Sequence, residues 1–473
     1  MDFPIFHLDF FGNRVLFGVV AILHVLINHS MAVGAVPLIA TMEWWGRRTG
    51  DAQWDRLAYR ILFVCFIITT TVGALSGVGI WLTASLVNPN AITTLIRIFF
   101  WGWFFEWIIF VIEVCLIMAY FLTWNGWGRR HKVAHIVMGY ALAFFSWITM
   151  VVIVAILSFM MDIGTWAEQP SLLTGVLNPI YIPQLAFRTP VAMVSAGIMA
   201  MFLVYFFTER RSEFYRRAVR FTSVWTLAWA LPALGGAFWY WQVIPDWAVR
   251  HIPVALGTQA FERWHATLVN IILAAVIAAA FVALWGLARP KWLPRVVLIV
   301  PFVLAMALLG YFERVREFIR KPYAVANLVY SNGLRPDDYA LLQEEGVLAH
   351  ATYVPMRTII PENRLEAGRH MFLIACTRCH TTTGVNGVVA KLTNLYGSNP
   401  WEHPIVLNYL KTMHNSRPFM PPAPGTDEEL SALADYLLSL QTNPARMVGA
   451  QTGGVRTPPV ASPGAAMPVA LQP

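Results

Sequence analysis

The chain has 473 residues, of which 57% are hydrophobic and only 13% are charged. Soluble domains usually carry about 25% charged residues, so the composition excludes an ordinary water-soluble enzyme. The net charge of +8 would suit a nucleic-acid-binding protein, but the basic residues lie mostly in short loops between apolar runs, which is the pattern of a membrane protein.

The first apolar run is too long for the core of a cleavable signal peptide and long enough to cross a bilayer. We therefore expect it to act as an uncleaved insertion signal. Seven more runs follow, each near or above the roughly 20 residues that a transmembrane helix needs. The eight expected spans are 15–42, 60–87, 98–124, 134–161, 189–208, 218–241, 265–287 and 294–312.

The loops between these spans differ sharply in basic content. The loops after spans 1, 3, 5 and 7, together with the first residues of the spans that follow them, hold 15 Lys and Arg residues, whereas the loops after spans 2, 4 and 6 hold only Arg97, Arg188, Arg250 and Arg263. Basic loops stay in the cytoplasm. The N-terminus and everything after about residue 312 are therefore predicted to lie on the outer side of the membrane.

Composition divides the chain into four parts. Residues 1–320 form the expected eight-span membrane domain, and 321–361 form a polar linker. A compact unit follows at 362–442. The end of the chain, 443–473, is rich in Pro, Gly, Ala and Thr without apolar periodicity, which predicts a disordered tail.

The compact unit contains Cys376-Thr377-Arg378-Cys379-His380. Two thiols followed by a histidine at this spacing attach a haem c covalently, with His380 as proximal iron ligand. A zinc site would need a second ligand pair, and a redox dithiol would need a βαβ context; the sequence indicates neither. Haem c is attached on the outer face of the bacterial membrane, the side that the loop arginines predict. Cys65 and Cys115 lie in apolar runs and are expected to pack as small hydrophobic residues.

The second axial ligand must follow later in the chain. We favour Met420, within Arg417-Pro418-Phe419-Met420-Pro421-Pro422, because neighbouring prolines stiffen a loop and a thioether suits haem c iron. The alternatives are Met413, Met447, His370, His403 and His414.

The compact unit resembles a class I cytochrome c along its whole length. Leu365 to His370 looks like the first helix of that fold, and Asp427 to Leu440, with Tyr436 inside it, looks like the closing helix. The resemblance implies one-electron transfer without bond-making chemistry.

Ionisable residues inside the spans are costly and are therefore functional candidates. They are His24 and His29 in span 1, Glu106 and Glu113 in span 3, His135 at the start of span 4 and His265 at the start of span 7.

Several landmarks resemble the large subunit (subunit I) of cytochrome bd-type quinol oxidases over about residues 10–330. They are Asn13-Arg14-Val15-Leu16-Phe17 through His24 to Met42-Glu43-Trp44, Gly73 to Trp81, Trp127 followed by His135, Leu177-Asn178-Pro179, and Glu317-Phe318-Ile319-Arg320-Lys321-Pro322-Tyr323. The resemblance implies b- or d-type haems among the spans and a second, similar helical subunit in a hetero-oligomer. His24 matches the ligand of the high-spin haem. Glu113, or alternatively Glu106, matches an acidic pair linked to that haem and its proton supply, and Glu317 falls near a late acidic region.

The chain also departs from that family. The histidine that ligates the low-spin haem falls at about Arg188, and the matching methionine falls near Thr267, beside His265 as an alternative ligand. The loop at 242–264 is too short for the quinol-binding loop, and the haem c unit replaces the last helix. These departures argue against quinol oxidation at the usual site. Arg188, Arg263 and Arg320, on the expected outer side, are candidates for pairing with haem propionates.

We therefore expect an all-α membrane protein, an eight-span bundle followed by an extracytoplasmic class I cytochrome c domain in the bacterial cytoplasmic membrane. Its expected role is a respiratory subunit that transfers electrons between a c-type cytochrome or other redox protein and haem of the bundle. One alternative is a terminal reductase of oxygen or nitric oxide fed by haem c. Another is a haem-free anchor for the cytochrome within a larger complex.

Overall fold

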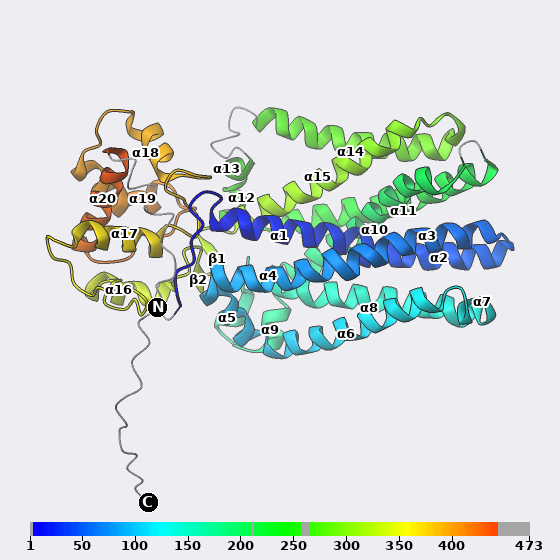
Figure 1. Ribbon diagram of the computed structural model, residues 1–473, viewed down its shortest axis with the longest axis horizontal. Coiled ribbons are helices and arrows are strands. Elements are labelled where there is room, and N and C mark those ends of the chain that lie inside the picture. Colours follow the sequence, from blue (N-terminus) through cyan, green and yellow to red (C-terminus); the bar gives the residue numbers. More distant parts are fainter. Residues whose placement is uncertain (1–2, 210–211, 257–264, 443–473) are drawn as a thin grey trace, which may run out of the picture.

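The computed structural model describes residues 3–209, 212–256 and 265–442, apart from the side chains of 265–269, 271–272, 275, 295–296 and 442. It is mostly helical, with a bundle of long helices at one end and a small helical domain at the other (Figure 1). The predicted tail, Arg263 and Met447 lie outside the described residues, as do the side chains of His265 and Thr267.

Long helices make up the bundle. Two pairs are joined without a loop by π-helical turns: α1 (Asn13–Ile27) with α2 (Ala35–Thr49), and α3 (Ala52–Ile68) with α4 (Ala74–Val87). The others are α6 (Phe100–Thr123), α8 (Lys132–Phe159), α10 (Tyr181–Phe207), α11 (Glu213–Val243), α14 (His265–Ala288) and α15 (Arg295–Ile319). Short helices cap the ends: α5 (Pro89–Ile98), α7 (Trp127–Arg130), α9 (Leu172–Val176), α12 (Asp246–Val249) and α13 (Ile252–Leu256).

Among the described residues, seven helical stretches are long and apolar enough to cross a membrane. They correspond to the predicted spans 1–6 and 8, and α14 occupies the position of predicted span 7. The prediction of a helical membrane domain is confirmed. The count of eight crossings remains a prediction.

Helix α10 lies at the centre of the bundle, where small residues permit close contacts. A Cβ added to Gly34 would lie 2.1 Å from the carbonyl oxygen of Ala192, and one added to Gly236 would lie 2.3 Å from that of Ala186. Glycine at these positions lets backbones approach as they do in membrane helix pairs. The long helices therefore form one tightly packed unit.

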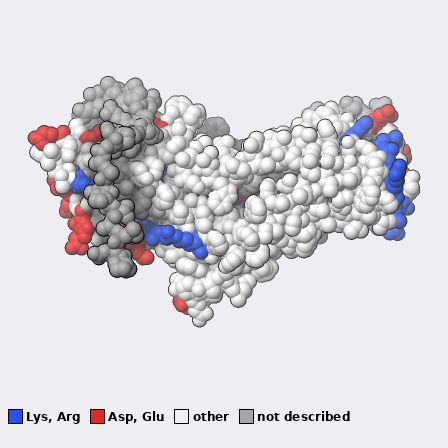
Figure 2. Space-filling view, turned by 60° about the horizontal axis from the view of Figure 1, so that its bottom comes forward, with Lys and Arg blue, Asp and Glu red and all other residues white. Residues whose placement is uncertain are grey.

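Charge is distributed unevenly along the molecule. In Figure 2 a broad belt of uncharged surface covers the bundle, and Lys and Arg gather at the end farthest from the small domain. An uncharged belt is the surface that lipid requires. The small domain lies beyond one end of this belt, and the basic loops lie beyond the other end.

The small domain consists of α17 (Arg364–Ala375), α18 (Val388–Tyr396), α19 (His403–Ser416) and α20 (Asp427–Thr442). Helices α17 and α20 cross closely: a Cβ on Gly368 would lie 2.0 Å from the carbonyl oxygen of Ala432. Beside this crossing the rings of Phe372 and Tyr436 lie 5.8 Å apart. The first and closing helices expected from the sequence therefore form and pair.

The segment 321–361, predicted as a linker, is structured and contacts both domains. Strands β1 (Tyr323–Val325) and β2 (Val329–Tyr330) form a hairpin whose Val325 and Val329 pack on the bundle near Phe99 and Phe159. Helix α16 (Tyr339–Glu345) and the residues after it contribute to the core of the small domain. The segment thus connects the two domains through side-chain packing as well as covalently.

Candidate functional site

The Cys-x-x-Cys-His segment lies directly after α17, which ends at Ala375. The backbone N–H groups of Cys379 and His380 both donate to the carbonyl of Cys376, at 3.0 and 2.9 Å. This tight turn brings both thiols and the imidazole to the same end of α17. Both cysteines are free thiols, and burial raises the pKa of the Cys376 thiol to about 12.

The His380 ring is held in the orientation that an iron ligand needs. Its Nδ1 donates to the backbone carbonyl of Asn386 at 3.0 Å, which leaves Nε2 with the lone pair. A carbonyl on the far ring nitrogen is the usual support of a metal-bound histidine. Burial lowers the pKa of His380 to about 4, so the imidazole is neutral at physiological pH. The residues present therefore fit a covalent haem c.

Met420 lies in the loop between α19 and α20, as expected from the prolines around it. Its backbone carbonyl accepts a hydrogen bond from His414 Nδ1 at 2.5 Å, so His414 supports the loop. Of the alternative ligands, Met413 and His414 lie on α19, His370 lies in α17 with Nε2 3.2 Å from Glu366, and His403 Nε2 lies 3.2 Å from the carbonyl of Ser431. Met420 remains the candidate.

The haem-binding segment faces the membrane domain. Lys321 Nζ donates to Cys379 Sγ at 3.4 Å. Arg378, between the two cysteines, donates from Nε to the carbonyl of Val87 at the end of α4, at 2.9 Å. Phe419, next to Met420, packs on Phe318 of α15 with ring centroids 5.7 Å apart. The haem motif and the Met420 loop thus both contact the end of the bundle that lies next to the small domain.

Basic side chains line this junction. Arg14 of α1 pairs with Glu317 of α15 at 3.0 Å, and Lys321 lies 3.9 Å from the same carboxylate. Arg320 is 6% exposed, and its Nε has no hydrogen-bond partner among the described residues. Burial lowers the pKa of Arg320 to about 10. A buried guanidinium with a free N–H is suited to an anionic group such as a carboxylate.

His24 lies on α1 and faces α4. Its Nδ1 lies 3.2 Å from the carbonyl of Gly73 and 3.1 Å from Ser76 Oγ, and its Nε2 lies 2.6 Å from the amide nitrogen of Asn28. A Cβ on Gly77 would lie 3.0 Å from the ring, so glycine makes room for it. With Nδ1 donating to a backbone carbonyl, Nε2 accepts from the Asn28 amide, so ligation of iron by His24 would require Asn28 to move away. The role of His24 as a haem ligand remains a prediction.

Arg188 is buried in an ion-pair cluster. Its Nη2 donates to Glu313 at 2.6 Å and its Nη1 lies 3.1 Å from His29 Nε2, while Arg316 donates to the other oxygen of Glu313 at 2.8 Å. The second ring nitrogen of His29 lies 3.2 Å from the carbonyl of Val25. Neither His29 nitrogen is open to iron. Sequence reasoning missed Glu313, although an acidic residue near the end of a predicted span was a detectable signal.

The two acidic residues of α6, Glu106 and Glu113, have different surroundings. Glu113 accepts hydrogen bonds from Ser146 at 2.5 Å and from Thr149 at 3.2 Å, both on α8. Glu106 lies about two helical turns nearer the N-terminal end of α6 and is half-buried. The structure therefore couples Glu113 to a neighbouring helix, and the catalytic role of either acid remains a prediction.

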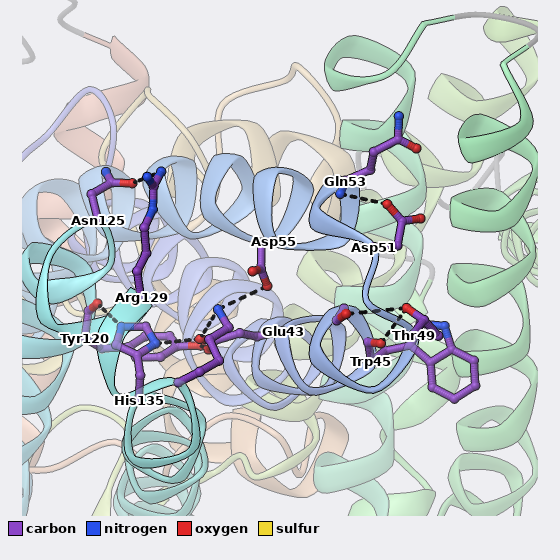
Figure 3. Close-up of polar contacts among 12 residues, drawn as sticks. Glu43, Trp45, Thr49, Asp51, Gln53, Asp55, Tyr120, Asn125, Arg129 and His135 are labelled. Atoms are coloured by element: carbon purple, nitrogen blue, oxygen red, sulfur yellow. Dashed lines mark hydrogen bonds and ion pairs between the residues drawn. The ribbon is translucent and has the colours of Figure 1, made fainter.

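A second buried cluster lies at the basic end of the bundle, where Tyr120 and His135 converge on Glu43 (Figure 3). Glu43 is fully buried and accepts from Tyr120 at 2.7 Å, lies 2.7 Å from His135 Nδ1, and pairs with Lys132 at 2.7 Å. His135 Nε2 lies 3.0 Å from the carbonyl of Tyr120. Both nitrogens of His135 are thus occupied, which explains its place in the bundle without a metal. From the sequence, Glu43 is only one of the landmarks of the family resemblance, and its partners were not predicted.

A covalent-haem motif on a small helical domain, held against an apolar bundle with buried histidines, defines a membrane-bound cytochrome. Residues 13–237 match the family model of cytochrome bd terminal oxidase subunit I, and residues 363–437 match that of cytochrome c oxidase, cbb3-type, subunit III. The membrane domain therefore resembles the large subunit of cytochrome bd-type oxidases and is fused to a cytochrome c domain. The second match implies covalent haem c.

A search of solved structures finds the bd oxidase from Geobacillus thermodenitrificans. The match has 15% sequence identity and a TM-score of 0.54, and covers 67% of this chain and 89% of that chain. At this identity the likeness concerns the fold alone. No curated protein matches the chain.

Proposed function

We propose that the chain is a respiratory cytochrome subunit that transfers electrons between an extracytoplasmic redox partner and haem in its bd-oxidase-like bundle. The observation that carries the proposal is the contact of the haem motif with the end of the bundle, from Arg378 to Val87 of α4 and from Cys379 to Lys321, two residues after α15. When bound, haem c supplies reversible one-electron exchange. The contact favours exchange inside one chain over a role as a freely diffusing cytochrome.

We propose the following roles for the candidate residues. Cys376 and Cys379 would form the thioether bonds, and His380 and Met420 would bind the iron. His24 would bind the iron of a b- or d-type haem, with His265 as a further candidate ligand. Arg320 and Arg263 would neutralise propionates; the Arg188–Glu313 pair instead favours a buried structural role for Arg188.

The proposed location is the cytoplasmic membrane of a bacterium, with the N-terminus and the cytochrome c domain on the periplasmic side. The basic end of the bundle supports this orientation, because it lies opposite the haem c domain (Figure 2) and basic loops remain in the cytoplasm. A second helical subunit and a c-type cytochrome or other soluble redox protein are the expected partners.

The first test is a pyridine haemochrome spectrum of the purified protein. The proposal expects haem c together with b- or d-type haem; haem c alone would reduce the bundle to an anchor. His380→Ala should abolish the low-spin c-type signal, and Met420→Ala should remove the absorption band of methionine-ligated ferric haem while leaving the covalent haem in place. An unchanged band in Met420→Ala would assign the distal ligand to another residue.

The observation that favours an enzyme is the pair of hydrogen bonds that Glu113 accepts inside the bundle, since carboxylates within membrane spans often belong to proton relays. A terminal reductase should consume oxygen, or nitric oxide, when supplied with a reduced c-type donor. Glu113→Gln should slow that consumption, with Glu428→Gln, an exposed carboxylate of α20, as control. No consumption in the intact complex would leave electron transfer as the activity.

A further inference from the structure

The N-terminal segment before α1 runs along the haem c domain, although nothing in the sequence marks it. We name residues 6–12 the strap. Asp9, 7% exposed, accepts a hydrogen bond from the backbone N–H of Thr382 at 2.7 Å and another from the Thr382 hydroxyl. The carbonyl of Phe10 accepts from the backbone N–H of Val385 at 2.9 Å. The strap thus contacts the loop that follows His380.

The fit between strap and loop depends on glycine. A Cβ on Gly384 would lie 2.1 Å from the carbonyl oxygen of Phe10, so only glycine permits this approach. On the other side Gly12 has φ +78°, a left-handed conformation that favours glycine, and it turns the strap into α1. The side chain of Asn13 then fixes the strap by accepting from Leu8 N–H at 3.0 Å and donating to the carbonyl of Phe6 at 2.7 Å.

The contacted loop is the one that orients the proximal histidine. The Thr381 hydroxyl donates to the carbonyl of Val385 at 3.0 Å, and the next residue, Asn386, supplies the carbonyl that receives His380 Nδ1–H. Asp9 therefore holds a loop of seven residues in which one end is His380 and the other end is its hydrogen-bond acceptor. In the other direction Asp9 is four residues from the start of α1, the helix that carries His24.

We infer that Asp9 is a positioning residue for haem c: it fixes the His380–Asn386 loop to helix α1 and so sets both the His380 hydrogen bond and the place of the haem relative to the bundle. The inference rests on the proposed function, in which this loop carries the haem c. In the proposed exchange one electron would pass between a haem c held by His380 and a haem held by His24, and no bond would form or break. Asp9 touches neither iron and acts through the loop.

Asp9→Ala and Asp9→Asn in the full-length protein test the inference. In Asp9→Ala the peptide containing residues 381–387 should exchange amide hydrogen faster. The midpoint potential of haem c should rise, because a looser Nδ1–H···O bond makes the imidazole a weaker donor to ferric iron. Electron transfer to the bundle should slow, because the loop that carries His380 is no longer fixed to α1. The variant Asp9→Asn keeps one acceptor oxygen. Its amide exchange rate, midpoint potential and electron-transfer rate should lie between those of Asp9→Ala and those of the parent.

The control is Phe11→Ala, which removes an exposed side chain of the same strap and should leave all three measurements unchanged. Gly384→Ala disrupts the same contact between the strap and the loop by a change in the loop, and it should reproduce the changes seen in Asp9→Ala. The pyridine haemochrome spectrum of the parent protein tests the proposed function separately from the role of Asp9. A parent protein without haem c, or without membrane haem, would contradict the proposed function. Normal haem content with an unshifted potential and unchanged exchange in both Asp9→Ala and Gly384→Ala would overturn the inference about the strap.

Discussion

At the scale of single residues, Glu429 shows how a buried carboxylate organises the haem c domain. It is 4% exposed and accepts hydrogen bonds from three backbone N–H groups, those of Val347, Leu348 and Thr426, at 2.8, 2.7 and 3.0 Å. Two of these donors belong to the segment 321–361 and the third precedes α20. One side chain therefore joins the connection between the domains to the closing helix of the cytochrome fold.

Replacing Glu429 by Ala should destabilise the haem c domain by about 2–6 kcal/mol, because it leaves the two buried N–H groups of Val347 and Leu348 without an acceptor, at a cost of about 1–3 kcal/mol each. Chemical denaturation of the full-length protein, followed at the haem c Soret band, measures the change. Glu428→Gln, on the exposed side of the same helix, should unfold as the parent does. Equal midpoints for all three proteins would contradict the assigned role.

Glu366, in the first turn of α17, makes the same domain sensitive to acid. Hydrogen bonds from His370 and then from Arg369 lower the pKa of Glu366 to about 2, against the opposing effect of burial. Since this pKa is depressed on folding, the stabilisation is fully present above the ordinary carboxyl pKa of about 4.3 and is lost as pH falls from there toward 2.

Glu366→Gln should therefore be less stable than the parent at pH 6, and the difference should disappear near pH 2. Unfolding by denaturant at a series of pH values, read by circular dichroism, gives the comparison. A difference that stays constant across this range would mean that the charge of Glu366 is not the cause.

At the scale of helices, close contacts between elements depend on small residues. Gly368 of α17 meets the backbone of α20 at Ala432, and Phe372 and Tyr436 pack beside the contact. The crossing fixes the end of α17, and the haem motif begins at the next residue. Packing between two helices therefore determines where the cysteines and His380 lie.

Gly368→Val should separate α17 from α20, because a Cβ at this position has no space, and overpacking typically costs about 1–3 kcal/mol. The expected results are a lower unfolding temperature and reduced covalent haem c per chain. Ala at 390, an exposed position of α18, offers the matched control Ala390→Val. Normal haem content and stability in Gly368→Val would show that the helices can move apart without consequence.

The Glu43 cluster joins α2, α6 and α8 at the basic end of the bundle. Removing one partner of a buried ion pair costs about 3–5 kcal/mol, so Glu43→Gln should lower the unfolding temperature of the detergent-solubilised protein while leaving the haem c spectrum unchanged. Glu209, an exposed acid in the loop after α10, gives the control Glu209→Gln. A parent-like unfolding temperature would assign the cluster a role other than stability.

At the scale of the whole molecule, the haem c domain is attached by contacts on several elements: the strap, Arg378 on the end of α4, the 323–330 hairpin and Phe419 on α15. Most of these contacts are buried or apolar. Such contacts are screened little by salt, in contrast to exposed charge pairs.

Electron transfer between haem c and the bundle should therefore change less than about twofold between low salt and about 0.5 M salt, since mobile ions screen exposed charges within a few ångströms at that concentration. Flash photolysis or rapid mixing of the intact protein measures the rate. A steep loss with salt would mean that the two domains are held by exposed charges and come apart.

The sequence by itself determined the features that depend on local chemistry. Apolar runs of sufficient length specify membrane helices, and the haem motif specifies covalent attachment through Cys376, Cys379 and His380. The first and last helices of the cytochrome fold also followed from the sequence, as did the resemblance of the membrane domain to bd oxidases.

Only the tertiary structure decided which distant residues meet. Asp9 meets Thr382, 373 positions away, Arg188 meets Glu313, and Glu43 meets Tyr120 and His135. Hydrogen bonds and ion pairs act over about 3 Å in space and leave no periodic signal along the chain. For the same reason the sequence does not indicate that the strap contacts the haem c domain, nor that segment 321–361, predicted as a linker, packs on both domains.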